Sequence, residues 1–324
     1  MKRRNILAAA AALPLAISAP QVALAALRRT IRLVVPYAAG GPTDAMARVL
    51  QPLLQDSVGA TVVVDNVPGA GGAIGAQAVV RAPADGNSFF LGNNGPSAVT
   101  PLLLRENAGF DPVKDFVPVG MIARATMLLA VSTDVPATDM KSFLAYARAN
   151  PGKLNFASAG VGSLGHLASE LLAKEAGLKM THVAYKGQAP TLTALLSGEV
   201  QMLLTTPTST MRGYISSGRI KLIAVTSEEP SPQYPGTDVA RNAVPGFVVY
   251  SWFALMARSG MPEAPLAEMR KALGTALADQ EVRRKFEDFG VSVDAAGPEQ
   301  VSQYIRQDLS RWRAIIQEQG IKPE

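Results

Sequence analysis

Short apolar runs along this chain end in glycine-rich turns, and hydrophobic residues at helical spacing follow them. The first run covers 31–35, and Thr43 or Asp44 can cap the helix that begins after its turn. Apolar residues then recur at helical spacing over 46–54, although Pro52 is expected to kink or shorten this helix. The pattern predicts a strand, a turn and a helix in succession.

Two more predicted strands, 61–65 and 88–91, end in the polar or glycine-rich turns 66–75 and 92–95. In open parallel sheets, ligands bind where such strands end. A turn that opens a helix leaves backbone N–H groups without partners at the positive end of the helix dipole. These turns therefore predict a site for a small carboxylate or phosphate, although glycine in a turn can also serve the backbone alone.

The same alternation of strands and helices continues after a loop at 111–116. We predict a long strand at 121–132, shorter strands at 154–158, 182–185, 200–205 and 221–226, and helices over 139–150, from 164 to a cap at Gly177, over 190–196 and up to Gly218. A proline-rich connection, 230–245, then leads to a strand at 250–256, and three helices close the chain.

The length of 324 residues favours two lobes over one core. The sequence predicts an α/β fold in which each lobe is a sheet flanked by helices. The strands 121–132 and 250–256 are the expected crossings between the lobes. They place residues 26–124 and 247–324 in the first lobe and 125–246 in the second, with a hinged cleft between them.

The first residues have the pattern of an export signal. Basic residues at 2–4 precede an apolar run over 6–17, and Ala-Leu-Ala at 23–25 is the small-residue pattern that a signal peptidase cuts. We therefore predict a signal peptide at 1–25 and a mature protein in the periplasm. The paired arginines also fit a twin-arginine signal, so the export route stays open between the two.

Composition excludes several classes of function. The pI is about 9.4, but without the predicted signal 28 basic and 26 acidic residues remain, so no nucleic-acid partner is expected. Cysteine is absent, which excludes disulfides, thiolate catalysis and cysteine-based metal sites. No segment approaches about 20 uninterrupted apolar residues, so the mature chain is expected to be soluble.

Residues 160–165 match G-x-G-x-x-G between a predicted strand and a helix, which is the context of a dinucleotide site. That fingerprint also needs an acid about 20 residues later to bind the ribose, and none lies between Glu175 and Glu199. The turn 69–75 misses the spacing because Ile74 stands at a glycine position. We therefore expect no cofactor, and a helix start that binds a plain carboxylate fits the same residues.

Neither histidine, His166 or His182, has a second histidine or an acid at metal-ligand spacing. His166 can bond a loop or approach a ligand, whereas His182 is predicted to pack within its lobe. The pattern around Ser163 is no G-x-S-x-G, because Val161 stands where that motif has glycine. Asp44 is better explained as holding the first turn than as a catalytic acid. The sequence thus gives no support for an enzyme.

Several segments follow one another in the order of a known family. They are VVPYAAGGPTD (34–44), DNVPGAGGAIG (65–75), FDPVKDF (110–116), NFASAGVGSLGHL (155–167) and HVAYKG (182–187), with Trp252 and Arg311-Trp312 later. The chain resembles the Bug-type receptors, the extracytoplasmic solute-binding proteins of tripartite tricarboxylate transporters. The resemblance implies a two-lobed periplasmic-binding-protein fold, type II-like, which closes on one small organic anion. It also implies a monomer that passes this ligand to integral membrane transporter subunits.

In that family, backbone amides and ordered waters of the strand-end turns hold a carboxylate. The ligand-binding residues implied here are Tyr37, Ala39, Gly40, Thr43, Asp44, Gly69, Ala70, Gly71, Gly72, Gly75, Asn93, Ser158, Gly160, Gly162, Ser163, His166 and Thr205. Three positions depart from the usual family residues, with Ala39 and Ala184 in place of proline and Tyr37 in place of phenylalanine. These departures bear on the identity of the ligand more than on the fold.

Family members that take amino acids are expected to present an acid to the ammonium group near the end of the strand 200–205. Thr205 and Thr206 are neutral here. We therefore predict a carboxylate without an amine, such as a dicarboxylate, a hydroxy acid or an aromatic acid. Two other functions stay open, which are an enzyme that acts on a carboxylate substrate and a receptor that serves signalling.

Overall fold

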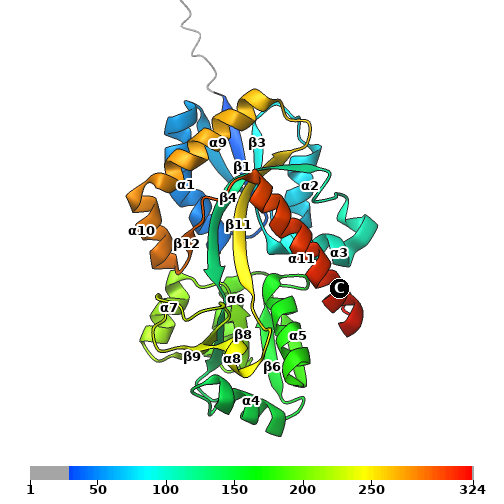
Figure 1. Ribbon diagram of the computed structural model, residues 1–324, viewed down its shortest axis with the longest axis vertical. Coiled ribbons are helices and arrows are strands. Elements are labelled where there is room, and N and C mark those ends of the chain that lie inside the picture. Colours follow the sequence, from blue (N-terminus) through cyan, green and yellow to red (C-terminus); the bar gives the residue numbers. More distant parts are fainter. Residues whose placement is uncertain (1–28, 323–324) are drawn as a thin grey trace, which may run out of the picture.

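The computed structural model describes residues 29–322, which form two six-stranded sheets, one in each lobe (Figure 1). The first sheet has the order β12-β4-β11-β3-β1-β2. Its strands are β1 (Thr30–Val35), β2 (Thr61–Asn66), β3 (Ser88–Asn93), β4 (Phe116–Thr126), β11 (Tyr250–Arg258) and β12 (Ser292–Val293). Because β1 runs parallel to both β2 and β3, the three turns predicted after these strands lie at one edge of the sheet.

The second sheet has the order β10-β9-β5-β8-β6-β7. Its strands are β5 (Leu128–Ser132), β6 (Leu154–Ser158), β7 (Met180–Ala184), β8 (Met202–Thr205), β9 (Ile220–Val225) and β10 (Asp238–Val239). Here β6 is parallel to β7 and β8, whereas β5 is antiparallel to β8 and β9. The predicted two-lobed α/β fold is confirmed.

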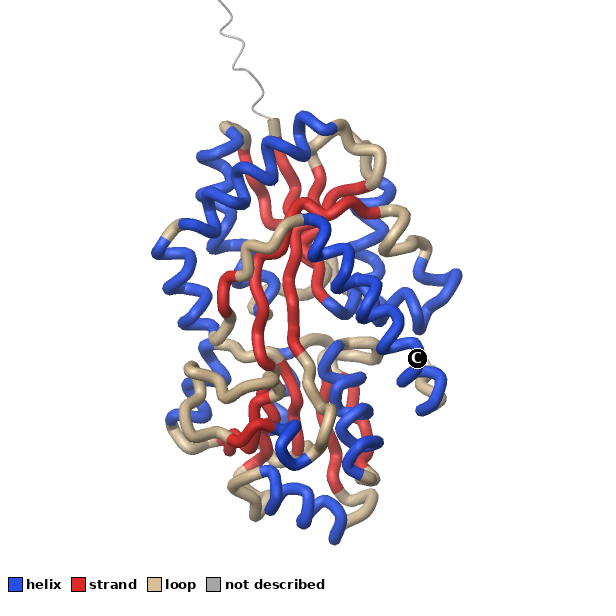
Figure 2. Tube along the Cα trace, in the orientation of Figure 1, coloured by secondary structure: helices blue, strands red, loops and turns tan. Residues whose placement is uncertain are grey.

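Helices cover both faces of each sheet (Figures 1 and 2). The first lobe has α1 (Pro42–Val58), α2 (Ala73–Arg81), α3 (Thr100–Leu104), α9 (Glu263–Ala278), α10 (Gln280–Phe289) and α11 (Pro298–Gln319), with short helical turns at Ala70–Gly72, Gly95–Val99 and Arg105–Ala108. The second lobe has α4 (Met140–Ala149), α5 (Leu164–Ala176), α6 (Gln188–Leu196), α7 (Ser209–Ser216) and α8 (Ala240–Ala243). The capping box of Asp139 at α4 and the left-handed Gly177 after α5 agree with the predicted helix ends.

Burial on both faces explains why the strands read as continuous apolar runs. Along β1, Leu33 and Val35 belong to one hydrophobic cluster, with residues of α1 and α9, and Val34 belongs to a second cluster, with residues of α2 and α11. Along β5, Leu129 and Leu128 divide in the same way between two clusters of the second lobe. Successive side chains of a strand point to opposite faces, so the part of a strand that is covered on both sides carries apolar residues at successive positions. In β1 this part is 33–35, whereas Arg32 is exposed.

Two segments cross between the sheets, where β4 passes into β5 at Met127 and where Val249 leads into β11. The buried Thr226 joins them, because its hydroxyl accepts from Met127 N at 2.9 Å and donates to Val249 O at 2.6 Å. The predicted division of the lobes at 124/125 and 246/247 falls beside these crossings. The prediction of one strand over 121–132 was wrong, because the chain changes sheets inside it.

The last helix, α11, also reaches across the lobes (Figure 2). It packs on the first sheet through Val301 and Ile305, whereas Trp312 and Ile315 belong to a hydrophobic cluster built mainly by the second lobe. Near its end, Glu318 pairs with Lys174 of α5. The helix α11 therefore links the first sheet to α5, the second-lobe helix that begins at the cleft.

Three local predictions are corrected. The helix α1 begins at Pro42 after Gly41, and neither Thr43 nor Asp44 caps it. Pro52 does not end this helix, which continues to Val58, because buried residues on both sides of the proline anchor it to the core. The connection 230–245 also contains β10 and α8.

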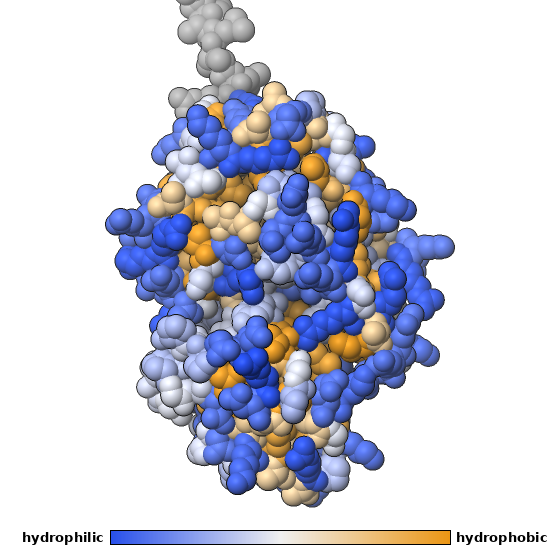
Figure 3. Space-filling view, viewed as in Figure 1, coloured by the Kyte–Doolittle hydropathy of each residue, from blue (hydrophilic) through white to orange (hydrophobic). Residues whose placement is uncertain are grey.

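The predicted signal peptide, 1–25, lies outside the described residues. Within 29–322, none of the helices combines the length and the apolar composition needed to cross a membrane. On the face in Figure 3, hydrophilic side chains cover most of both lobes, and hydrophobic ones reach the surface between the elements.

Candidate functional site

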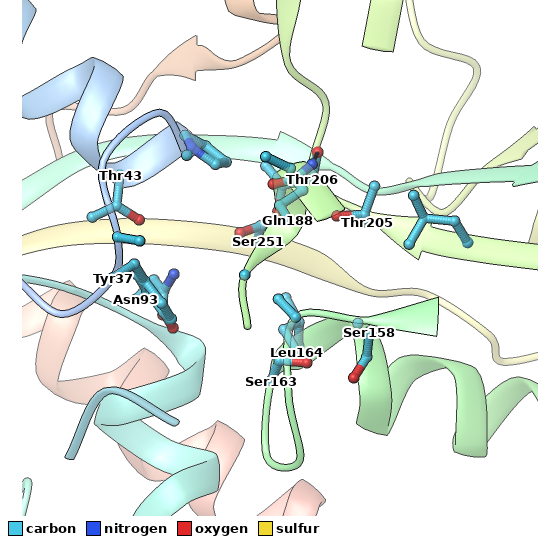
Figure 4. A pocket seen from close by; sticks show the side chains of 18 of the residues that line it. Tyr37, Thr43, Asn93, Ser158, Ser163, Leu164, Gln188, Thr205, Thr206 and Ser251 are labelled. Atoms are coloured by element: carbon cyan, nitrogen blue, oxygen red, sulfur yellow. Dashed lines mark hydrogen bonds between the residues drawn. The ribbon is translucent and has the colours of Figure 1, made fainter. Parts of the chain in front are cut away.

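A cavity of about 150 Å³ lies between the two lobes, at the strand ends of both sheets. In Figure 4, Tyr37, Thr43 and Asn93 of the first lobe face Ser158, Ser163 and Thr205 of the second across it. The residues that line the cavity are Tyr37, Ala38, Ala39, Gly41, Pro42, Thr43, Asn93, Met127, Ser158, Ala159, Ser163, Leu164, Gly165, Lys186, Gly187, Gln188, Ala189, Pro190, Leu203, Leu204, Thr205, Thr206, Ser251 and Phe253. Residues of the turn predicted after β1 and of the turn predicted at 92–95 therefore line the same cavity.

Three helices begin at the wall of this cavity. The helix α1 starts after Gly41 in the first lobe, and α5 and α6 start after Ser163 and Gly187 in the second. The first N–H groups of a helix have no partner within it and carry the positive end of its dipole. Since the three starts converge from both lobes, an anion in the cavity would meet partial positive charge on two sides.

Asp44 builds the first turn from behind the cavity. Its side chain is 3% exposed and does not line the cavity. It accepts hydrogen bonds from Gly40 N, Arg48 Nε and Asn66 Nδ2, each at 3.0 Å. Burial opposes the ionisation of Asp44, but these hydrogen bonds outweigh it and hold its pKa below the ordinary value. The carboxylate therefore shapes the backbone of the turn that lines the cavity, and it does not itself line the cavity.

Tyr37 and Asn93 form the polar wall of the first lobe. The Tyr37 hydroxyl donates to Asn93 Oδ1 at 2.9 Å, and Gly95 N donates to the same oxygen at 3.1 Å. Burial raises the pKa of Tyr37, so its hydroxyl stays neutral and able to donate. Because both donors require an oxygen partner, the Asn93 amide is oriented with its nitrogen as the group left for the cavity.

In the second lobe, a pair of imidazole rings lies behind the cavity wall. The rings of His166 and His182 stack with centroids 3.9 Å apart, and Phe156 stacks on His182 at 5.0 Å. His182 Nε2 lies 2.6 Å from the hydroxyl of Ser158, and His166 Nδ1 accepts from Gly162 N at 3.3 Å. His182 therefore has the packing role that the sequence predicted, and His166 supports the turn before α5.

Burial lowers the pKa of both histidines. It falls to about 4 in His182 and to about 3 in His166, where repulsion by His182 adds to the effect of burial. Both rings are therefore neutral at pH 7. The prediction that no acid stands at metal-ligand spacing from His166 was wrong, because Glu170 follows four residues later on α5, with 3.8 Å between its Oε1 and His166 Nε2. Burial raises the pKa of Glu170.

The second glycine-rich turn lies beside the cavity and not in its wall. A Cβ on Gly71 would come within 2.9 Å of Thr100 Oγ1 and 3.3 Å of Val161 O, and one on Gly75 within 2.9 Å of Pro36 Cα. These glycines allow the turn to pack closely against both lobes. The predicted residues that do not line the cavity are Gly40, Asp44, Gly69, Ala70, Gly71, Gly72, Gly75, Gly160, Gly162 and His166; their contact with a ligand stays a prediction.

The sequence interpretation missed the loop between β7 and α6. Lys186 and Gln188 line the cavity, and Gln188 Nε2 donates to Thr206 O at 2.6 Å. The signal was present, because Gly187 follows a predicted strand just as the glycines of the other turns do. Ser251, on β11, carried no such signal, since it lies inside an apolar strand.

The charge of the cavity wall is one-sided. No aspartate or glutamate is among the lining residues, and Lys186 is the one lysine or arginine among them. Within 29–322, no group of three histidine, aspartate or glutamate residues could hold a metal ion. The wall therefore suits a small anion that bonds to N–H groups, hydroxyls and one ammonium group.

Two α/β lobes that enclose such a cavity define the class of binding proteins that close on a small solute. The sequence of this chain matches the tripartite tricarboxylate transporter family receptor over residues 46–321, and the chain belongs to this family.

Three solved structures are similar over nearly their whole length. A Rhodopseudomonas palustris protein solved with adipate is 32% identical, with a TM-score of 0.86 over 91% of this chain and 99% of its own. The periplasmic binding protein BugD is also 32% identical, with a TM-score of 0.84 over the same shares. MatC from R. palustris, solved with malate, is 30% identical, with a TM-score of 0.82 over 89% of this chain and 99% of its own. The resemblance to the Bug-type receptors is thereby confirmed.

Proposed function

We propose that this protein captures a small carboxylate in the cavity between its lobes and delivers it to a tripartite tricarboxylate transporter. The observation that carries the proposal is the convergence of three helix starts on a cavity without an acidic residue in its wall. Backbone N–H groups at helix starts bind carboxylates well. A wall without aspartate or glutamate does not repel a carboxylate ligand. The adipate and malate of the similar R. palustris structures support the same class of ligand.

The proposed ligand is a dicarboxylate, a hydroxy acid or an aromatic acid, and not an amino acid. An ammonium group would need a carboxylate or several free acceptors in the wall. Thr205 and Thr206 offer hydroxyls only, and Thr206 O is already bonded to Gln188. An amino acid would therefore lose the hydration of its ammonium group without a charged partner in return.

Binding is proposed to shift the lobes from an open to a closed state. The wall is divided between the lobes, so only the closed state supplies both sets of N–H groups to one ligand. The crossings at Met127 and Val249 are the segments that join the lobes in chain order, which makes them the candidates for the hinge. Compaction in small-angle scattering on addition of the ligand would support this step.

We propose that the protein acts in the periplasm, where the predicted signal peptide would send it, as a monomer that meets integral membrane subunits. We also propose that it binds its ligand without turnover. Neither histidine lines the cavity, and both are held neutral in a stack. No cofactor is expected for such a function.

A thermal-shift screen of the mature chain, refolded to remove bound ligand, tests the proposal. The panel contains mono-, di- and tricarboxylates, amino acids and nucleotides. A ligand at 100 times its dissociation constant stabilises the folded state by about 2.7 kcal/mol, which shifts the melting temperature by several degrees. We expect a shift with one carboxylate class. Silence across all carboxylates, or a shift with NAD(P), would overturn the proposal.

A further inference from the structure

Lys186 is the charged side chain of the cavity wall that the proposed function leaves unexplained. It lies in the loop between β7 and α6, directly before Gly187, which is the first residue of the α6 start. The residue is exposed, and its Nζ has no ion pair or hydrogen bond within the part of the chain that the structure describes. A lysine side chain without a partner is free to reorient on its flexible stem.

The loop that carries Lys186 is held in place by its neighbour. Gln188 Nε2 donates to Thr206 O at 2.6 Å, which joins the start of α6 to the end of β8. The backbone beneath Lys186 is therefore fixed to the cavity wall, while the side chain remains mobile. This combination suits a group that follows the position of a charge on the ligand.

The two ends of the cavity differ in the strength of their positive charge. The first lobe offers the start of α1 and the Asn93 amide, which carry partial charges only. The second lobe offers the starts of α5 and α6 together with the full charge of Lys186. A ligand with one carboxylate needs only one of these ends, whereas a ligand with two can place one at each.

We propose that Lys186 selects dianions over monoanions by pairing with the second carboxylate of a bound ligand. The inference rests on the proposed function. Partial charges on N–H groups serve any carboxylate, so they discriminate little between the two kinds of ligand. An ammonium group adds to its hydrogen bond the Coulomb attraction between a full positive charge and the carboxylate, which a neutral N–H donor does not supply. Lys186 thus increases the affinity for a ligand with a second carboxylate, and the other groups of the wall do not.

The test compares each dicarboxylate with the monocarboxylate of equal chain length. The pairs are succinate and butyrate, glutarate and pentanoate, and adipate and hexanoate, measured by isothermal titration calorimetry. The proteins are the wild type, Lys186→Met, Lys186→Arg and a control, Lys153→Met. Lys153 is also exposed and in the second lobe, but it does not line the cavity.

For the pair that the wild type binds best, we expect Lys186→Met to reduce the preference for the dianion roughly tenfold. That loss corresponds to about 1.4 kcal/mol. The affinity for the monocarboxylate should change little, and Lys186→Arg should retain most of the preference. Raising the salt concentration should weaken dianion binding in the wild type more than in Lys186→Met, because salt screens an exposed charge.

The outcomes separate the inference from the proposed function. A wild type that binds none of the three dicarboxylates overturns the role of Lys186, whereas only silence across the whole carboxylate panel of the thermal-shift screen, or a shift there with NAD(P), overturns the proposed function. A wild type that binds a dicarboxylate, with Lys186→Met equal to Lys153→Met in its preference, leaves the proposed function standing and overturns the role of Lys186. Equal affinity of the wild type for a dicarboxylate and its matched monocarboxylate overturns that role as well.

Discussion

The two lobes support their halves of the cavity by opposite electrostatic means. In the first lobe, the buried carboxylate of Asp44 gathers donors from the turn, from α1 and from β2. In the second lobe, the neutral rings of His166 and His182 stack behind Ser158 and the start of α5. Neither support lines the cavity, so both act on the proposed anion site through the backbone and hydroxyl groups that they hold in position.

The difference teaches how each half should fail. A buried charge is stable only while its donors surround it, and removing either side leaves the other without a partner. A stack of neutral rings needs no counter-charge, but it resists protonation because the added charge would be buried. Substitution should therefore break the first half, and acid should break the second.

The largest effect of a single substitution is expected from Asp44→Ala. The substitution removes the acceptor for Gly40 N, Arg48 Nε and Asn66 Nδ2. We expect the free energy of unfolding to fall by about 3 kcal/mol and ligand affinity to fall with it, because the turn before α1 loses its shape. Urea denaturation and calorimetry measure the two. Asp56→Ala, at an exposed position on the same helix, should change neither by more than about 0.5 kcal/mol, and a similar loss there would contradict the assignment.

Acid should destabilise the second half next. Below the ordinary histidine pKa of 6.5, both histidines become protonated in the unfolded chain. In the folded protein they become protonated only at lower pH, because the pKa is about 4 for His182 and about 3 for His166. Stability is therefore complete above pH 6.5 and falls as the pH drops through this window. The loss at pH 5 should be about 2 kcal/mol for each histidine.

Urea denaturation at pH 7.5 and pH 5 checks this expectation. The substitutions His166→Gln and His182→Gln should each lower stability at pH 7.5, because each removes the packing of one ring. Each should also reduce the fall in stability between pH 7.5 and pH 5. If the double variant loses as much stability between the two pH values as the wild type, the stack is not the source of the acid sensitivity.

The sequence predicted the lobes because each buried strand carries its own signal. The run 31–35 is apolar apart from the exposed Arg32, since residues 33–35 pack on both faces of the sheet, and the glycines after it mark a turn before a helix. The segment 121–132 was expected to cross between the lobes, but the break between β4 and β5 at Met127 was not predicted, because Met127 and the residues that follow it are apolar and buried. The passage between the lobes could therefore be predicted, and the exact residue at which the chain leaves the first sheet could not.

The candidate site was predicted in part for the same reason. The turns at Ala39 and Ser163 belong to a local pattern of strand, glycine and helix, and the structure places both in the cavity wall. The turn 69–75 has the same pattern, but Thr100 and Val161 pack against it, and neither neighbour can be known from the turn itself. Ser251 enters the wall from a strand distant in sequence. What could not be predicted is which glycine turn faces the cavity and which faces protein.

Substitution of Thr226 tests how the two crossings between the lobes are held together. Its hydroxyl bridges Met127 N and Val249 O, one on each crossing. Thr226→Val keeps the shape but leaves both groups without this partner, so we expect a loss of about 1–2 kcal/mol of stability and a change in the open–closed balance seen by small-angle scattering. Thr226→Ser keeps the hydroxyl and should behave nearly as the wild type. A loss of stability in Thr226→Ser with none in Thr226→Val would mean that the methyl group, and not the bridge, matters at this position.

The smallest effect, and the most discriminating, is expected at Gly71. It shares its backbone conformation with Gly59, since φ is 61° at both positions. Alanine in this left-handed region costs about 1 kcal/mol wherever it stands. A Cβ on Gly59 would meet no atom within 4 Å, whereas one on Gly71 would lie 3.3 Å from Val161 O of the other lobe. Gly59→Ala and Gly71→Ala therefore differ in their contacts and not in their backbone.

Both variants should lose about 1 kcal/mol of stability through the backbone, and Gly71→Ala should lose more, because its Cβ would also lie 2.9 Å from Thr100 Oγ1 of its own lobe. Only Gly71→Ala should also lose ligand affinity, by a few-fold. The reason is that its added methyl group opposes the approach of the turn at Val161, which closure of the lobes requires, while an open state is free of that contact. Calorimetry on the two variants, with the carboxylate that the wild type binds best, measures the difference. Unchanged affinity in Gly71→Ala would mean that the second glycine turn does not follow the closure of the lobes, and that the first turn alone couples this lobe to the ligand.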